Sequence, residues 1–188
     1  MKKQEQIEDA VVDIILSEGA FAVSTVKVAK KVGISQSNVY LYFKNRDDML
    51  MSVYQRQIKR IQSRVDFKQL GDVSIPIETR VKMYVRSVYD FSKENPQGLT
   101  VIQQIKFLMG QVDFGPAIDF VKLNEVVPKL IKEAARQRLI KPMPASVLMA
   151  MVFAVISTNI NNVKKGEYSK DQYSFEDLFA LVWEGIKL

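Results

Sequence analysis

The side chains best suited to specific chemistry lie between Ser24 and Arg46, and their types favour hydrogen-bond recognition over catalysis. This segment offers amides, hydroxyls and lysines, whereas the whole chain contains no cysteine and no histidine. Disulfides, thiolate nucleophiles, imidazole bases and nearly all transition-metal sites are thereby excluded. No pair of carboxylates stands in a catalytic motif. We therefore expect neither an enzyme nor a bound cofactor or metal.

The stretch from Thr25 to Phe43 has the spacing of two short helices around a glycine turn. Gly33 stands where the first helix must end, because glycine adopts a left-handed conformation without a Cβ penalty. Ala29 is small enough for the two helices to cross closely, and Ser35 can cap the second helix. The inward positions are apolar, namely Val28, Val32, Ile34 and Val39. The pattern predicts a helix-turn-helix whose second helix, residues 35–42, enters the major groove of DNA.

This placement indicates which residues would contact the bases and the phosphates of DNA. Gln36, Ser37 and Asn38 begin the second helix, where side chains reach base edges, and Gln and Asn pair naturally with adenine. Tyr40 and Tyr42 are suited to phosphates or bases, although one of them could instead pack against the first helix of the chain. The residues assigned to phosphates, which position the protein without selecting a sequence, are Ser24, Thr25, Lys27, Lys44 and Arg46.

The distribution of charged residues also favours DNA as the partner. Between Thr25 and Arg46 the chain has five basic residues and no acidic one, within a whole-chain net charge of +6. Contacts to phosphates supply most of the sequence-independent affinity for DNA. Lys30 and Lys31 belong to this group, but exposed lysines need no function and these two could simply face solvent. The alternative for the whole motif is a helical hairpin that happens to bend at a glycine.

These residues resemble the N-terminal signature of the TetR family of transcriptional regulators, over about the first third of the chain. The matching segments are Gly19-Ala20-Phe21, Ser24-Thr25-Val26, Val28-Ala29, Val32-Gly33-Ile34-Ser35, Val39-Tyr40-Leu41-Tyr42-Phe43 and Asn45-Arg46-Asp47. The rest of the chain resembles the family only in length and helical layout. Ser37, Asn38 and Arg46 depart from the residues usual in the family, which bears on the bases selected rather than on DNA binding itself.

The resemblance implies a C-terminal domain that binds an effector and forms a homodimer. Methionine suits adaptable apolar sites, and the candidate effector-binding residues are Tyr54, Tyr84, Tyr89, Phe107, Met109 and Phe120. An ordinary helical core is the alternative for them. The last two helices are expected to pair with their counterparts in a second subunit through Met149, Phe153, Ile156, Phe179 and Trp183. Trp183 fits an interface or a core equally well.

Periodicity along the chain predicts an all-α protein of about nine helices. A three-helix DNA-binding domain is expected over residues 1-45, and a ligand-binding and dimerisation domain over 46-188, with a linking helix over 46-66. Residues 67–75 are predicted to form a loop, and Gly115-Pro116 to open a helix that Pro128 kinks or splits. The first helix is predicted to present an apolar face from Ile7 to Ile15 and to end near Gly19. Further helices are predicted over 77–94, 99–109 and 145–164, and from a capping box at Ser174 to the C-terminus.

The apolar run from Ala145 to Ile156 is shorter than the roughly 20 residues of a membrane-spanning helix, so a buried helix is expected and no membrane association. No cleavable targeting segment is visible, which predicts a cytoplasmic protein.

The sequence thus favours a ligand-responsive regulator, most simply a repressor that binds a palindromic double-stranded operator as a homodimer and is released by a small apolar or amphiphilic effector. A DNA-binding activator or a ligand-independent DNA-binding protein remains the alternative.

Overall fold

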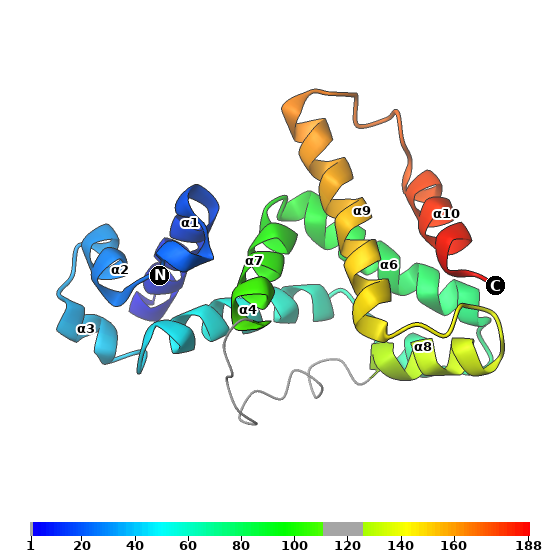
Figure 1. Ribbon diagram of the computed structural model, residues 1–188, viewed down its shortest axis with the longest axis horizontal. Coiled ribbons are helices and arrows are strands. Elements are labelled where there is room, and N and C mark those ends of the chain that lie inside the picture. Colours follow the sequence, from blue (N-terminus) through cyan, green and yellow to red (C-terminus); the bar gives the residue numbers. More distant parts are fainter. Residues whose placement is uncertain (1, 111–125) are drawn as a thin grey trace. The chain divides into compact units, whose positions relative to one another are not determined.

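The computed structural model describes residues 2–110 and 126–188, and every regular element in these ranges is helical (Figure 1). The all-α fold class with an N-terminal helix-turn-helix is confirmed. The elements are α1 (Lys3–Glu18), the 3-10 helix η1 (Ala20–Ala22), α2 (Thr25–Val32), α3 (Gln36–Tyr40), α4 (Arg46–Gln62), α5 (Phe67–Gly71), α6 (Ile77–Glu94), α7 (Gly98–Gly110), α8 (Val126–Arg136), α9 (Ala145–Lys165) and α10 (Phe175–Ile186).

The chain divides into two compact units. Unit 1 contains α1, η1, α2, α3, α4 as far as Arg60, and α7; unit 2 contains α5, α6, α8, α9 and α10. These units differ from the predicted segments 1-45 and 46-188, because most of α4 stays with the N-terminal helices and α7 returns to them. The helix α7 packs on α1 and η1, so unit 1 is built from two separate stretches of sequence.

In unit 1, α1 buries an apolar face that includes Ile7, Val11 and Ile14. Its polar side is joined to α4 by Arg56, whose guanidinium contacts the Glu8 carboxylate at 3.1 Å and the Asp9 carboxylate at 2.8 Å. Because Glu8 is only 6% exposed, this pair fixes α4 against α1 and keeps a buried carboxylate neutralised.

The prediction of a loop over residues 67–75 is wrong for Phe67–Gly71, which form the helix α5. The linking helix α4 ends at Gln62 rather than near residue 66, because Asp66 starts a new helix: its side chain accepts a 3.0 Å hydrogen bond from the Gln69 backbone N–H. The apolar periodicity of the long helix extends to about Asp66, whereas aspartate is also a strong N-cap residue and here starts the next helix. The result is the short helix α5.

The remaining predicted helix bounds agree closely with the structure, with two points to add. Pro128 lies in the first described turn of α8, whose described part runs without interruption to Arg136. The predicted helix opening at Gly115-Pro116 lies outside the described residues.

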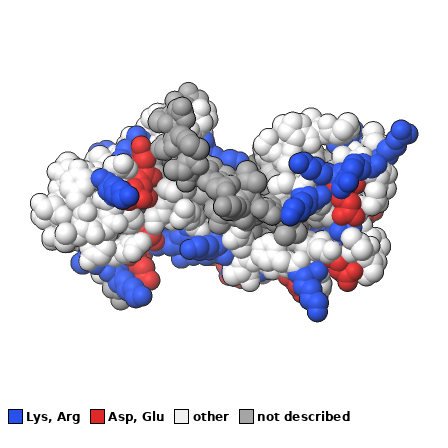
Figure 2. Space-filling model, turned by 90° about the horizontal axis from the view of Figure 1, so that it is seen from below, with Lys and Arg blue, Asp and Glu red and all other residues white. Residues whose placement is uncertain are grey.

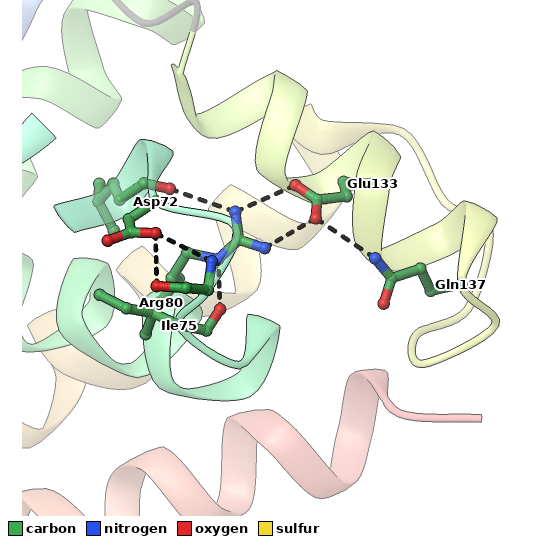
Figure 3. A network of polar contacts seen from close by, with 7 residues as sticks. Asp72, Ile75, Arg80, Glu133 and Gln137 are labelled. Carbon is green, nitrogen blue, oxygen red and sulfur yellow. Dashed lines mark hydrogen bonds and ion pairs between the residues drawn. The ribbon is translucent and has the colours of Figure 1, made fainter. Parts of the chain in front are cut away.

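In unit 2, α6 contacts α5, α8, α9 and α10 and forms the centre of the packing. Arg80 of α6 is only 2% exposed and faces Glu133 of α8, to which it donates two hydrogen bonds of 2.7 and 3.0 Å (Figure 3). It also donates to the backbone carbonyl oxygens of Ile75 and Leu70. One buried side chain therefore joins α8 to the chain before α6.

The last two helices pack closely on each other. A Cβ atom at Gly185 of α10 would lie 2.5 Å from the Met151 Cε of α9, so glycine permits this approach. The capping box predicted at Ser174 is confirmed: Ser174 Oγ accepts from the Asp177 N–H, and the Asp177 carboxylate accepts from the Ser174 N–H. The C-terminus is held by the Lys141 N–H, which donates to the Ile186 carbonyl at 2.8 Å.

The predicted helix over 145–164 is confirmed as α9, but its burial is one-sided. Its buried apolar residues are Leu148, Val152 and Ile156, whereas Val147 is 45% exposed. By length and composition alone α9 could cross a membrane, and only 28% of its most apolar stretch is buried. Among the described residues, a large part of its apolar surface is thus uncovered.

Candidate nucleic-acid interface

The helix-turn-helix geometry predicted from the sequence is present in unit 1. Ser24 caps α2 by accepting from the Lys27 N–H at 3.2 Å, and Ser35 caps α3 by accepting from the Asn38 N–H at 3.2 Å. Gly33 closes α2 in the left-handed conformation, with φ of 72°. Val28 and Ala29 of α2 and Val39 of α3 are buried, so the two helices are fixed through one small apolar contact surface.

This packing directs the polar edge of α3 outward. Gln36, Ser37 and Asn38 are exposed, as are Tyr40 at 51% and Tyr42 at 44%. An exposed row of amides and hydroxyls on one short helix is what a protein needs in order to meet the base edges of a groove.

Gln36 is held in place by one hydrogen bond to α2 and one within α3. Its Nε2 donates to Thr25 Oγ1 at 2.8 Å and to Tyr40 Oη at 3.2 Å. With both amide hydrogens engaged, the Oε1 atom is left to accept a hydrogen bond from outside. Thr25, which the sequence analysis assigned to a phosphate, is buried and orients Gln36 instead.

The predicted phosphate-contacting residues differ in how available they are. Lys44 is exposed, and its N–H donates to the Asp48 carboxylate at 2.8 Å, which positions the turn before α4. Lys27 pairs with Glu18 at 2.6 Å and Lys31 with Asp13 at 3.3 Å, so a phosphate must compete with a carboxylate for each of them. Ser24 uses its oxygen as an acceptor in the cap and retains its hydroxyl proton for a phosphate.

Arg46 is placed differently from the sequence prediction. Its Nη2 donates to the carbonyl oxygens of Ala20 at 3.0 Å and Phe21 at 3.4 Å, and its Nε is buried. The guanidinium therefore stabilises η1, the connection between α1 and α2, rather than extending outward. Only a tertiary contact across 26 positions could reveal this, since the same residue in the sequence looks like part of a basic cluster.

Charge on this part of unit 1 is confined to the margins of the motif. No charged residue occurs between Ile34 and Phe43. Figure 2 shows the end of the unit that carries α2 and α3 as mostly uncharged, with basic side chains beside acidic ones around it. A neutral polar edge flanked by cations is suited to bases in the centre and phosphates at the sides.

Comparison with known proteins agrees with this geometry. Residues 9–53, which span most of α1 to the first half of α4, match the sequence model described as bacterial regulatory proteins, tetR family. A crystal structure of a candidate transcription regulator from Lactobacillus plantarum is 47% identical, with 99% of each chain covered and a TM-score of 0.87. The chain belongs to the TetR family.

Further proteins match nearly the whole chain at lower identity. The TetR-family transcriptional regulator of Haemophilus influenzae is 20% identical over 98% of this chain and 96% of that one, with a TM-score of 0.65. The nucleoid occlusion factor SlmA of Vibrio campbellii is 25% identical over 98% of this chain and 96% of its own length. The present protein is accordingly a TetR-family transcriptional regulator with a helix-turn-helix for DNA binding.

The candidate effector-binding residues of this TetR-family chain are distributed over both units. Tyr54 and Met109 are buried in unit 1, where Phe107 is 65% exposed. Tyr84 is buried in unit 2 and Tyr89 lines a cleft there. Phe120 lies outside the described residues. Burial raises the pKa of Tyr54 to about 12.

The candidate interface residues also separate into two groups. Ile156 is 1% exposed and Phe179 is 5% exposed, so both belong to the packing of α9 and α10 within one chain. Met149, Phe153 and Trp183 are partly exposed and remain available to a second subunit.

Gln104 of α7 is a contributor that sequence inspection missed. Its Oε1 accepts a 3.0 Å hydrogen bond from the Ala20 N–H, and the nearby Phe107 ring meets the Phe21 ring edge-on at 6.5 Å. Ala20 and Gln104 are 84 positions apart in the sequence, so no local sequence pattern indicates this contact. Both backbone polar groups of Ala20 are therefore held by side chains, one from α7 and one from α4.

Proposed function

We propose that this protein is a dimeric repressor that binds a palindromic operator and is released by a small apolar or amphiphilic effector. The observation that carries the proposal is the exposed polar edge of α3, with Gln36 oriented by Thr25 and Tyr40. A side chain that is already held in place loses less conformational entropy on binding, so its hydrogen bond contributes more to selectivity.

The arrangement favours particular base contacts. Gln36 presents a carbonyl oxygen, which suits the amino group of adenine or cytosine in the major groove. A two-point contact with adenine would require one of its internal bonds to break. Asn38, Ser37 and Tyr42 are exposed beside it, while Ser24 and Lys44 flank the edge for phosphates. Lys27 joins them when Glu18 is displaced.

A second subunit accounts for the uncovered apolar surface of α9 and α10. Val147 is 45% exposed on α9 and Leu181 is 60% exposed on α10, and Phe153 and Trp183 are partly exposed. Two such faces related by a two-fold axis would bury each other. The helix-turn-helix motifs of the two subunits would then contact DNA half-sites whose centres are about 34 to 36 Å apart, or a multiple of that distance.

Response to an effector is supported by the connectivity of the chain. The helix α4 starts beside the helix-turn-helix and continues to Gln62, which belongs to unit 2, and α7 follows directly from α6 of unit 2. A ligand that favours one conformation of unit 2 can therefore shift the conformation of unit 1, which carries the helix-turn-helix, through these connections. A coupling of about 1 to 3 kcal/mol is sufficient for a useful switch.

Selection from a randomised duplex library by the full-length protein tests the DNA-binding part of the proposal. Wild-type protein should select an inverted repeat. Gln36→Ala or Asn38→Ala should relax the preference at one or two symmetric positions, because a base contact is lost. Selection of the same sequence by all three proteins would refute the assigned contacts.

Salt dependence of binding distinguishes the phosphate contacts. Lys44→Ala should weaken binding to all duplexes and lower the slope of log K against log salt by about one for each subunit. Lys59→Ala is the matched control, since Lys59 is exposed on α4 away from the motif. Equal slopes for the two variants would rule out a phosphate contact at Lys44.

Ligand-independent DNA binding is the second candidate. It is favoured by the full-length relative from Vibrio campbellii, whose name describes a nucleoid occlusion factor rather than a metabolite sensor. Titration of the protein on its selected operator with apolar and amphiphilic compounds separates the two: release or tightening supports a ligand-responsive regulator, and unchanged affinity across the series supports the second candidate.

A further inference from the structure

Unit 2 contains a cleft of about 560 Å³ between the C-terminal ends of α6 and α9 and the segment that leads into α10. Tyr89 and Lys93 line it from α6, Asn159 and Lys164 from α9, and Lys170 and Tyr173 from the connecting segment. The volume falls within the range of small-molecule sites in proteins. All of the described lining residues belong to unit 2, so this part of the cleft lies within one compact part of the chain.

The charged residues that line the cleft are mostly basic. Lys93, Lys164 and Lys170 face one acidic residue, Asp171. Within the described residues none of these lysines forms an ion pair, although other lysines and arginines of unit 2 do, such as Lys82 with Glu176 and Arg80 with Glu133. Cations that converge on one cleft without carboxylate partners leave a positive potential inside it, which favours an anion.

The walls between the lysines are aromatic and apolar. The Tyr89 ring lies 5.4 Å from Phe175 and carries the Lys93 ammonium 5.7 Å from its centroid. Tyr173 meets Tyr168 edge-on at 4.9 Å, and Tyr168 Oη accepts from the buried Asn159 amide at 3.3 Å. These contacts hold the rings in position before any ligand enters. Ile160 and Val163 add aliphatic surface.

We propose that this cleft binds a small organic anion, with a carboxylate or phosphate among the lysines and an aromatic or apolar body against Tyr89 and Tyr173. Solvated lysines on a helical surface need no ligand, but this cleft combines three lysines that form no ion pair among the described residues with aromatic walls around a hollow of ligand size. The inference deepens the proposed function by naming a ligand class for unit 2, and it rests on that function only for its effect on DNA.

Calorimetric titration of the full-length protein tests the proposal with three probes of one shape. These are 1-naphthoate, 1-naphthyl phosphate and the uncharged 1-naphthalenemethanol. Both anions should bind at least about tenfold more tightly than the alcohol, because only they engage the lysines. Raising the salt concentration from 50 to 500 mM should weaken the anions and leave the alcohol nearly unchanged.

Substitution of the basic residues and of the acidic residue of the cleft should change the affinity for naphthoate in opposite directions. Lys164→Gln and Lys170→Gln should each weaken naphthoate binding about three- to tenfold, whereas Asp171→Asn should tighten it by removing the opposing carboxylate. Lys132→Gln on α8 is the matched control and should have no effect, since Lys132 is exposed away from the cleft. Circular dichroism of each variant verifies that the helices are intact.

Equal affinity for the alcohol and the two anions, or equal naphthoate affinity in the Lys164, Lys170 and Lys132 variants, would overturn the proposal. A preference for the phosphate over the carboxylate, or the reverse, identifies the head group and supports it. Because the titration contains no DNA, its failure leaves operator binding untouched. Failure of the library selection in turn leaves the anion site standing.

Discussion

Arg80 and Glu133 illustrate how one buried ion pair determines the local structure of unit 2. The guanidinium makes two hydrogen bonds to the carboxylate and two to backbone carbonyl oxygens, and Gln137 donates to the same carboxylate at 3.3 Å (Figure 3). Such a pair adds little net stability compared with apolar residues, yet its disruption is costly because the remaining charge has no partner.

Arg80→Met should therefore destabilise the protein by about 3 kcal/mol, the low end for a broken buried pair, because Glu133 keeps 25% of its side chain in solvent. Urea unfolding followed by circular dichroism measures the change. Arg86→Met is the control: Arg86 is 47% exposed, so its loss should cost no more than about 1 kcal/mol. Equal losses for the two variants would contradict the role assigned to Arg80.

The same pair predicts a pH dependence of stability. Hydrogen bonds from Arg80 hold the pKa of Glu133 below its ordinary value of 4.5. The unfolded chain thus takes up its proton at a higher pH than the folded chain, and the stabilisation is complete above pH 4.5 and declines as the pH falls through the lowered pKa. The difference in melting temperature between wild type and Glu133→Gln should accordingly shrink from pH 6 to pH 3. A constant difference would exclude this linkage.

At the scale of elements, the connection between α1 and α2 depends on helices from elsewhere in the chain. Gln104 of α7 accepts the Ala20 N–H, and Arg46 of α4 donates to the Ala20 carbonyl. A short 3-10 turn has few internal bonds to stabilise it. The position of α2 relative to α1 therefore depends on side chains outside the helix-turn-helix.

Gln104→Leu should lower the stability of unit 1 by about 1–3 kcal/mol, because the buried Ala20 N–H loses its acceptor. Gln104→Glu keeps an acceptor oxygen and should restore most of it. Amide hydrogen exchange at Ala20 provides the local measurement, with faster exchange expected only in the leucine variant. Gln103→Leu, one position earlier on α7, controls for the change in helix surface; faster Ala20 exchange in that variant too would argue against a specific bond.

At the scale of the whole molecule, the uncovered apolar surface of α9 and α10 determines the expected assembly. Val147→Glu combined with Leu181→Glu should convert the proposed dimer to a monomer, because two charges would be buried in the interface. Sedimentation velocity measures the change directly. Val73→Glu is the matched control, since Val73 is 80% exposed in the loop before α6. A wild-type protein that sediments as a monomer at micromolar concentration would refute the proposed dimer.

Local patterns in the sequence were sufficient to predict most elements, because caps and glycine turns act over a few residues. The Ser174 capping box, the left-handed Gly33 and the exposed Gln36 and Asn38 all follow from spacing alone. The helix α5 was missed for a local reason as well, since Asp66 was taken as the end of one helix rather than the cap of the next.

Tertiary structure alone decided which polar groups meet. Arg46 and Thr25 belong to a basic, polar segment in the sequence, yet they stabilise η1 and orient Gln36. The three lysines of the cleft come from α6, α9 and the segment before α10, and no periodicity relates them. The sequence determined the helices and the exposed edge of α3, because those depend on neighbours along the chain. The partners of Arg46, Gln104 and the cleft lysines depend on distances that only the packed fold fixes.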